Sequence, residues 1–402
     1  MVDGYWWMEW GGQLDTIKEN EEIRDELLAI LMGVWNHIKN QPGHGAENWA
    51  LEWFGFLPGK RESRRFVGQH VLTENDVMRS RPFDDAIAYG GWPIDTHPPE
   101  GVDRPEDSPC IQAPVPQLYD IPLRSCIARD FTNLLFAGRH ISATHLAFAS
   151  TRVMATCSLV GQGVGTAAAY AVTRDLLPAD LPVSPQHLRE IQQELLRQDV
   201  YLIGNPLFDA DDIIRQSRIS ASSEASEGSS QNILSGQNRC VQGSRGAPVD
   251  RQLPGTHRWI SDPEQDTPQW LQFDWEQPLA LAKLVIVFDT GLHRHLTLTQ
   301  SDAYARGMYW GTGQPETVKR FRVEGLNSQD TWEVLANEDH HYQRLWSYEC
   351  PKLATISALK ITFVETWGQN LTPGTEIKDP HIRQQAIRII RVSTYPPQKG
   401  DA

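Results

Sequence analysis

The sequence contains few cysteines, and they lie far apart. They are Cys110, Cys126, Cys157, Cys240 and Cys350, and no two of them form a C-x-x-C pair. Zinc sites and iron–sulfur clusters need closely spaced thiolates, and an odd, scattered set does not favour a disulfide framework. We therefore expect no metal site.

Long apolar runs and an excess of basic residues are also absent. No stretch approaches the ~20 apolar residues that a membrane-spanning helix needs, so no membrane span is expected. The formal net charge is −14, and the one dense basic cluster, residues 60–65, contains Glu62. Because no basic face offsets phosphate repulsion, we expect no nucleic-acid partner.

Length and composition indicate a globular chain of more than one domain. It has 402 residues, of which 40% are hydrophobic and 22% charged, which is ordinary for globular proteins. Residues 217–256 are rich in Ser, Gly, Gln and Asn, so we place a junction there.

Residues 134–172 carry the most informative pattern. The apolar run 134–136 predicts a buried parallel strand, and Gly138 lets the backbone turn at its carboxyl end, where open α/β sheets place their ligands. A small, apolar helix follows over residues 153–172, typical of a helix enclosed by protein, with Ser150 or Thr151 as the expected N-cap.

Two glycines of this helix, Gly161 and Gly165, lie four residues apart on one face. That spacing would let the helix approach a neighbouring backbone closely. Periodicity by itself favours a tightly packed core helix without any ligand.

The residue identities of this region are more informative than its hydrophobic periodicity. NLLFAGRHISATH followed by STRVMATCSLVGQGVGTAAA resembles the carboxyl-terminal FAD-contacting segment of FAD-dependent oxidoreductases of the glutathione-reductase-like flavoprotein superfamily. Residues 58–77, PGKRESRRFVGQHVLTENDV, and residues 121–135, IPLRSCIARDFTNLL, are similar to further blocks of that family. The resemblance covers most of residues 1–200. It implies FAD as cofactor and an oxidoreductase acting on a small-molecule substrate.

One element of the family's pattern is missing from this sequence. Such proteins begin with a strand, a G-x-G-x-x-G turn and a helix that together hold the FAD pyrophosphate. Here the nearest pattern, G-Q-G-V-G at residues 161–165, lies inside a helix, and Gly311-Thr-Gly313 lacks the third glycine. We therefore expect an amino-terminally truncated copy, with an incomplete Rossmann-type FAD domain over residues 1–205.

The resemblance implies cofactor contacts at the turn and at the start of the helix. The cofactor-binding candidates are Ala137, Gly138, Arg139, Ser150, Thr151, Arg152, Val153 and Met154. Backbone N–H groups at the helix start would stabilise negative charge on the reduced flavin ring.

Histidines and arginines near this turn are the candidates for chemistry on the substrate. His140 and His145 could donate or accept a proton, or they could be loop histidines without a catalytic role. Arg61, Arg64 and Arg65 could orient an anionic substrate or the FAD phosphates, because guanidinium groups pair with such oxygens. The alternative is that they pair with Glu62 and neighbouring acids.

Aromatic residues gather near the amino end, before and after an amphipathic helix expected over residues 20–38. These rings could line a pocket or form plain core. The set is Tyr5, Trp6, Trp7, Trp10, Trp49, Trp53, Phe54 and Phe56.

The carboxyl-terminal part has the alternating pattern of an antiparallel β-sandwich. Strands are expected within residues 270–275, 281–290, 319–326, 358–366 and 386–395. HRWISDPEQDTPQWLQFDWEQPLALAKLVIVFD resembles the discoidin or galactose-binding-like sandwich, which we place at residues 213–397. Loop residues that could contact a carbohydrate are His293, Arg294, His295, Tyr309 and Trp310. Docking of the sandwich onto the first domain is the alternative role.

The sequence thus predicts an α/β region followed by an all-β domain, and it leaves two functions open. One is an FAD-dependent oxidoreductase. The other is a non-catalytic remnant whose β-sandwich binds carbohydrate or a protein partner.

Overall fold

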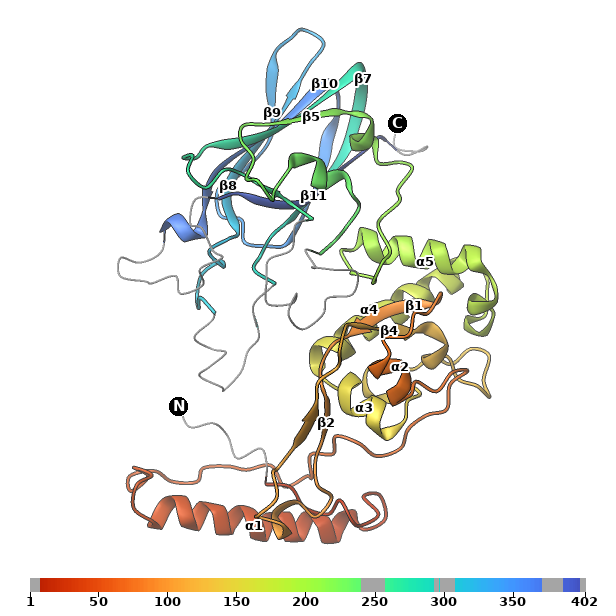
Figure 1. Cartoon of the computed structure of the whole chain (residues 1–402), viewed down its shortest axis with the longest axis vertical. Coiled ribbons are helices and arrows are strands. Elements are labelled where there is room, and N and C mark those ends of the chain that lie inside the picture. Colours follow the sequence, from red (N-terminus) through yellow and green to blue (C-terminus); the bar gives the residue numbers. More distant parts are fainter. Residues whose placement is uncertain (1–7, 240–256, 293–295, 297–307, 371–385, 398–402) are drawn as a thin grey trace. The chain divides into compact units, whose positions relative to one another are not determined.

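The computed structural model describes residues 8–239, 257–292, 296, 308–370 and 386–397. The chain divides into two compact units (Figure 1). The helical unit comprises Val2–Ala86 and Gly90–Ser184, and the strand unit comprises Pro185–Ala402 with Ile87–Tyr89 and Met1. The domain limits 1–205 and 213–397 remain predictions, and the structural division places the helix after residue 184 with the strands.

The helical unit contains four helices and short strands among its described residues. In chain order the elements are α1 (Asn20–Asn40), α2 (Glu74–Met78), β1 (Ala86–Gly90, which spans the division), β2 (Ile94–Thr96), β3 (Ile111–Ala113), β4 (Tyr119–Pro122), α3 (His145–Thr151) and α4 (Met154–Thr173). Strands β2 and β3 pair antiparallel, with Ile94 opposite Ala113. Helix α1 agrees with the amphipathic helix expected over residues 20–38.

The predicted strand over residues 134–136 does not form. Leu135 makes only an isolated antiparallel bridge with Ile127. A buried parallel strand depends on hydrogen bonds from neighbouring strands, and the described residues offer Leu135 no parallel neighbour.

The predicted N-cap of the following helix is also wrong, because the chain forms two helices where one was expected. Thr144 caps α3 by accepting a hydrogen bond from the backbone N–H of Ala147 at 3.3 Å, so helix begins early and includes Ser150 and Thr151. The chain then leaves helical geometry at Val153, which is the N-cap of α4 and gives it no side-chain cap.

Helix α4 buries one face and leaves the other open. Val160, Ala167 and Ala171 are at most 1% exposed, whereas Met154 is 84% exposed. A Cβ atom added at Gly161 or Gly165 would meet no atom within 4 Å. The expectation of a helix enclosed on all sides is therefore wrong for the described part of this chain.

The strand unit begins with a helix and continues as an antiparallel sheet. Its elements are α5 (Pro185–Arg197), β5 (Arg218–Ala221), β6 (Trp259–Ile260), β7 (Gln269–Phe288), β8 (Val318–Leu326), β9 (Trp332–Glu338), β10 (Leu345–Thr366) and β11 (Arg388–Tyr395). The strand order is β6-β11-β7-β10-β8-β9, with β5 also paired to β7. The five expected strand segments overlap β7, β8, β10 and β11, but 270–275 and 281–290 belong to the single strand β7, which ends at Phe288, and β11 begins at Arg388. The predicted α/β plus β-sandwich class is confirmed.

Large apolar side chains fill the interior of the strand unit. Trp259, Phe273, Phe288, Phe321 and Phe363 are at most 1% exposed. Phe273 and Phe321 alternate with polar residues, since successive side chains of a strand point to opposite faces, whereas Phe288 ends a continuous buried run in β7.

Hydrogen bonds attach the end of α5 to the strands. Arg391 of β11 donates to the Leu196 carbonyl at 3.1 Å, and Arg344 donates to the Asp199 carboxylate at 2.5 Å. Because these groups are buried, they hold α5 to the sheet more firmly than surface pairs would.

Candidate functional site

A tight turn follows the segment expected as a strand. Gly138 has a φ of +63°, a left-handed conformation that glycine adopts without steric cost. It opens a 3-10 turn, Gly138–His140, that packs against α4. The backbone turns at Gly138 as the sequence predicts, and Arg139 and His140 are exposed.

The turn borders a cavity of about 270 Å³, which we call the basic cavity. Its lining combines two segments that are more than 70 residues apart in sequence. The lining residues are Lys60, Arg61, Glu62, Ser63, Arg64, Arg65, Phe66, Arg139, His140 and Phe148. The structure thus brings together the three predicted phosphate or substrate arginines, one predicted cofactor residue and one predicted catalytic histidine.

Cations outnumber carboxylates around the basic cavity. Arg139 donates to the carbonyl oxygens of Lys60 and Arg61 at 2.9 and 3.0 Å, which ties the turn to the other segment. Glu62 is the one carboxylate of the lining, and it pairs with Arg65. Four arginines line this space, although the guanidinium group of Arg61 contacts Glu9 and His97. An excess of arginine favours an anionic ligand.

The second predicted catalytic residue, His145, lies beside this lining. Its Nδ1 atom is 2.7 Å from a carboxylate oxygen of Glu62. Burial lowers the pKa of His145, and the charge of Arg65 lowers it further, so the neutral imidazole is favoured. His145 therefore donates its Nδ1 proton to Glu62 and leaves Nε2 able to accept one.

The cofactor contacts predicted at the start of the helix differ in burial, because Ser150 and Thr151 are buried and Met154 is exposed. Ser150 is buried, lies 2.6 Å from the Tyr119 hydroxyl and donates to the Trp92 carbonyl at 2.5 Å. Thr151 is buried as well, and its hydroxyl has no hydrogen-bond partner among the described residues. Met154 points largely into solvent.

Arg152 belongs to a cluster that sequence reasoning missed, which we call the Glu9–His97 cluster. It comprises Glu9, Arg61, Asp95, His97 and Arg152. Arg152 donates to the Asp95 carboxylate at 3.2 Å, and the His97 ring lies between Glu9 and Arg152. Glu9, Asp95 and His97 sit in no recognisable motif, and their proximity arises only from folding.

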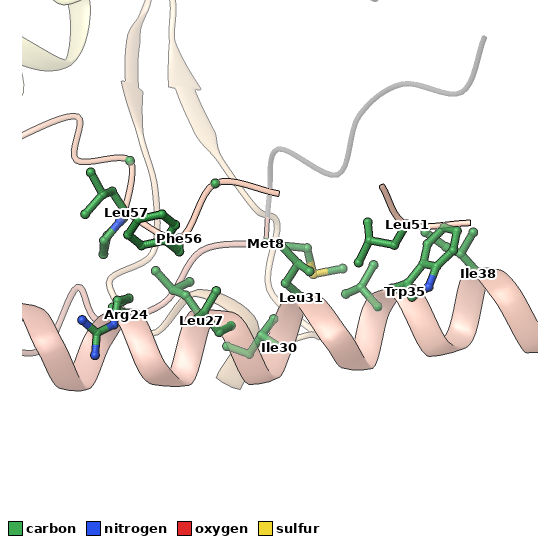
Figure 2. Close-up of a pocket in the computed structure, with 15 residues that line it drawn as sticks. Met8, Arg24, Leu27, Ile30, Leu31, Trp35, Ile38, Leu51, Phe56 and Leu57 are labelled. Atoms are coloured by element: carbon green, nitrogen blue, oxygen red, sulfur yellow. The ribbon is translucent and has the colours of Figure 1, made fainter. Parts of the chain in front are cut away.

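Of the aromatic residues predicted to line a pocket near the amino end, Phe56 does so, and Trp49 and Trp53 do not (Figure 2). An apolar groove of about 410 Å³ runs along α1, and Phe56 lines it together with Leu27, Leu31 and Trp35. Trp49 and Trp53 are not part of this lining and are 69% and 78% exposed.

Other members of that aromatic set lie elsewhere. Trp10 donates its indole N–H to Asp103 at 2.9 Å, and Phe54 is half-buried. Tyr5, Trp6 and Trp7 lie outside the described residues.

The predicted carbohydrate-contacting residues of the sandwich are only partly described. Trp310 is 54% exposed, and the neighbouring Tyr309 carbonyl accepts a hydrogen bond from Gln314 at 3.0 Å. His293, Arg294 and His295 lie outside the described residues.

The described ranges contain neither a metal-ligand cluster nor a membrane-spanning helix. There, no three or more His, Cys, Asp or Glu side chains are grouped so that they could hold a metal ion. Over the same part of the chain, no helix combines the length and apolarity needed to cross a membrane.

These features define the class as an α/β region followed by an antiparallel β-sandwich. Residues 3–195 match the family model described as FAD dependent oxidoreductase. The resemblance seen in the sequence is thereby confirmed for this part of the chain. No curated protein matches the chain.

Solved structures similar to this chain are family 32 carbohydrate-binding modules and lectin domains. The module of C. perfringens NanJ, solved with galactose, has 10% identity and a TM-score of 0.28, covering 46% of this chain and 98% of the module. The module of Streptococcus pneumoniae EndoD has 14% identity and a TM-score of 0.30, with 46% and 99% covered. The lectin domain of lectinolysin, solved with Lewis B antigen, has 12% identity and a TM-score of 0.29, with 48% and 100% covered.

Proposed function

We propose that the helical unit binds FAD and takes part in hydride or electron transfer on a small-molecule substrate. The observation that carries this proposal is the basic cavity, whose lining includes Arg64, Arg65, Arg139 and His140, while the guanidinium group of Arg61 contacts Glu9 and His97. Guanidinium groups in such an arrangement suit the phosphate oxygens of a dinucleotide.

Two features outside the lining of the basic cavity, among the predicted cofactor contacts at the start of α4, also support the proposal. The start of α4 has no side-chain cap, so its first backbone N–H groups remain able to donate to an electron-rich ligand. The buried hydroxyl of Thr151 lacks a hydrogen-bond partner among the described residues, and such a group is costly unless something satisfies it.

In this proposal each side chain has a limited role. When bound, flavin supplies the hydride or electron chemistry. Arg64, Arg65 and Arg139 would hold phosphate oxygens. His145, whose Nδ1 donates to Glu62, would hold or accept a proton at Nε2.

Absorption spectroscopy and titration test the proposal. FAD added to the purified chain should bind saturably and produce a protein-bound band near ~450 nm. Arg64→Gln should weaken binding of FAD and of inorganic pyrophosphate about tenfold, the scale of one charge-assisted hydrogen bond. Arg218→Gln, at a side chain 86% exposed in the strand unit, is the matched control. Equal affinities for the two variants would contradict the assignment.

The second candidate function is recognition by the β-sandwich. The half-exposed indole of Trp310 is the observation that favours it, because exposed aromatic rings stack on the C–H faces of sugars. A galactose titration followed by tryptophan fluorescence should give a saturable change that Trp310→Ala removes. Trp332→Ala, at a 38% exposed site on edge strand β9, is the control. Loss of the response in both variants would argue against a site at Trp310.

A further inference from the structure

A second cavity of the helical unit is lined by none of the residues predicted from the sequence. It has a volume of about 540 Å³, within the usual range for small-molecule sites. Its lining consists of Met8, Glu9, Pro98, Gly101, Val102, Arg104, Pro105, Asp107, Ser108 and Pro109. We call it the Glu9 cavity.

Glu9 connects this cavity to the Glu9–His97 cluster. One carboxylate oxygen of Glu9 pairs with Arg61, and the other is 2.7 Å from Nδ1 of His97. Nε2 of His97 lies 3.3 Å from a guanidinium nitrogen of Arg152. Arg152 and Arg61 can only donate, and both lie close to Nε2, so Nε2 accepts. Nδ1 is 2.7 Å from Glu9 and 3.1 Å from a guanidinium nitrogen of Arg61, so its proton is directed at the nearer Glu9 carboxylate.

The charges around His97 favour its neutral form. Burial is the largest effect and lowers the pKa of His97, and the nearby Arg61 and Arg152 lower it further against the opposing charge of Asp95. Glu9 is the other charged group that contacts the ring. A neutral imidazole with a fixed tautomer orients the Glu9 carboxylate, so His97 and Arg61 act on it as positioning residues.

The charges of the cavity wall are compensated within the protein. Arg104 pairs with Glu106 at 2.8 Å and with Asp107 at 3.1 Å, and Glu9 pairs with Arg61 and His97. An ionic ligand would therefore have to displace an existing partner to gain a counter-ion, which is unfavourable in a partly buried place. An uncharged ligand does not have to displace any of these ion-pair partners.

The remaining wall groups indicate what such a ligand contains. Each oxygen of a carboxylate can accept more than one hydrogen bond, so Glu9 can accept from a ligand hydroxyl while it keeps its two partners. Ser108 adds a hydroxyl, and three prolines with Val102 supply apolar surface for C–H groups. A polyol or a reduced sugar has this combination of donors and apolar carbon.

We propose that the Glu9 cavity binds a neutral, hydroxyl-bearing small molecule, with Glu9 accepting a hydrogen bond from one of its hydroxyl groups. The binding site stands on the geometry of this cavity. Its use as the substrate pocket of an oxidoreductase rests on the proposed function above.

The test observes His97 directly in the full-length chain. The chain is labelled at its 13 histidines, and the His97 imidazole signal is assigned as the one missing from His97→Gln. Sorbitol should shift this signal saturably. Gluconate, which has the same carbon skeleton and one negative charge, should bind at least tenfold more weakly.

Variants test the contribution of Glu9. Glu9→Gln keeps the shape of the side chain and should weaken sorbitol binding about tenfold, because a hydrogen bond to a charged acceptor becomes one to a neutral acceptor. Glu52→Gln, an exposed residue of the helical unit outside the lining, should leave the affinity unchanged.

Several results would overturn the proposal. If the His97 signal does not respond to sorbitol, the proposal is overturned. This holds even if sugars bind to the strand unit, because binding there leaves the His97 signal in place. Equal affinities for sorbitol and gluconate would also overturn the proposal. The titration is read in the unmodified chain, with His97→Gln used only to assign the signal. It contains no flavin, so its failure is distinguishable from failure of the FAD titration.

Discussion

In the strand unit a cluster of large aromatic side chains is fully buried, although Phe208 and Trp310 are exposed, whereas in the helical unit Trp49 and Trp53 lie mostly in water. Phe288 and Phe321 are at most 1% exposed, but Trp49, Trp53 and Leu57 are 69%, 78% and 75% exposed. Buried apolar area is the main favourable contribution to folding. The comparison indicates that the strand unit is stabilised by its own core, while the helical unit has apolar surface still to bury.

The largest expected effect is the loss of an aromatic side chain from the strand core. Phe288 contacts Phe321 and Phe363, so Phe288→Ala should lower the free energy of unfolding by about 3–5 kcal/mol, the transfer and cavity terms together. Phe131→Ala, at a 62% exposed site in the helical unit, should change it by less than about 0.5 kcal/mol. Urea denaturation followed by circular dichroism measures both. Equal losses would contradict the comparison.

A somewhat smaller loss is expected from the buried charges that attach α5. Asp199 accepts from Arg344 at 2.5 Å and from Arg239 at 3.4 Å, and burial lowers the pKa of Arg344. Asp199→Asn should cost about 3 kcal/mol, because it leaves buried guanidinium groups without a carboxylate.

Asp330→Asn is a matched control for this change. Both positions have a positive φ, +66° at Asp199 and +55° at Asp330, and Asp330 is exposed. A comparable loss at Asp330 would show that the backbone conformation, and not the ion pairs, carries the effect.

Cofactor binding should sharpen the difference between the units. On the proposed function, FAD at one hundred times its Kd stabilises the unit that binds it by about 2.7 kcal/mol. Calorimetry should show this gain in the transition of the helical unit, with the transition of the strand unit unmoved. A shift of the strand transition by itself would place the ligand in the other unit.

A smaller effect, of opposite sign in the two units, is expected on acidification. Burial by itself would raise the pKa of Asp76, but hydrogen bonds from Thr73 and Arg81 outweigh it and hold the pKa below 3.8. Burial raises the pKa of Asp212 above 3.8, against hydrogen bonds from Thr394 and Ile214.

The sign follows from which state binds more protons. As the pH falls from 3.8 through the lower folded-state pKa of Asp76, the unfolded state takes up more protons, and the helical unit loses stability. For Asp212 the folded state takes up the proton first, so acidification favours the folded strand unit. Asp76→Asn should flatten the acid dependence of the helical transition, and Asp212→Asn should steepen that of the strand transition. Unfolding curves at several pH values measure both slopes.

Local patterns in the sequence identify the strand unit well and the helical unit less well. Alternation of apolar and polar residues placed the core strands correctly, because each strand's burial follows from its own period-two pattern. The run 134–136 was equally apolar, yet it forms no strand, since strand formation there depends on a neighbour that local composition does not reveal. The capping bond of Thr144 similarly places the N-cap six or seven residues before the expected one.

The candidate site was predictable only where its residues stand in recognisable blocks. Arg61, Arg64 and Arg139 come from two such blocks, and folding brings them to one cavity. Glu9 and His97 are 88 positions apart and belong to no motif, so nothing in the sequence pairs them. Ion pairs of this kind are set by tertiary structure and can be found only in it.

The smallest expected effect concerns the open face of α4 and has the opposite direction from the core substitutions. Gly161 lies inside this helix with no neighbour within 4 Å of an added Cβ atom, so Gly161→Ala should stabilise the chain by about 0.5–1 kcal/mol through the lower flexibility of alanine in the unfolded state. Thermal unfolding of the helical unit measures this gain.

Gly165→Ala provides a replicate on the same face, since its added Cβ atom also meets nothing. The sequence predicts that both glycines allow close approach of a neighbouring backbone, and that neighbour is not among the described residues. If the open face remains open in solution, both substitutions stabilise the unit, and their gains add because the added methyl groups do not contact a common partner. Destabilisation by either alanine would show instead that another group packs against this face of α4 in solution. The contrast between an open helical unit and a closed strand unit would then not hold for α4.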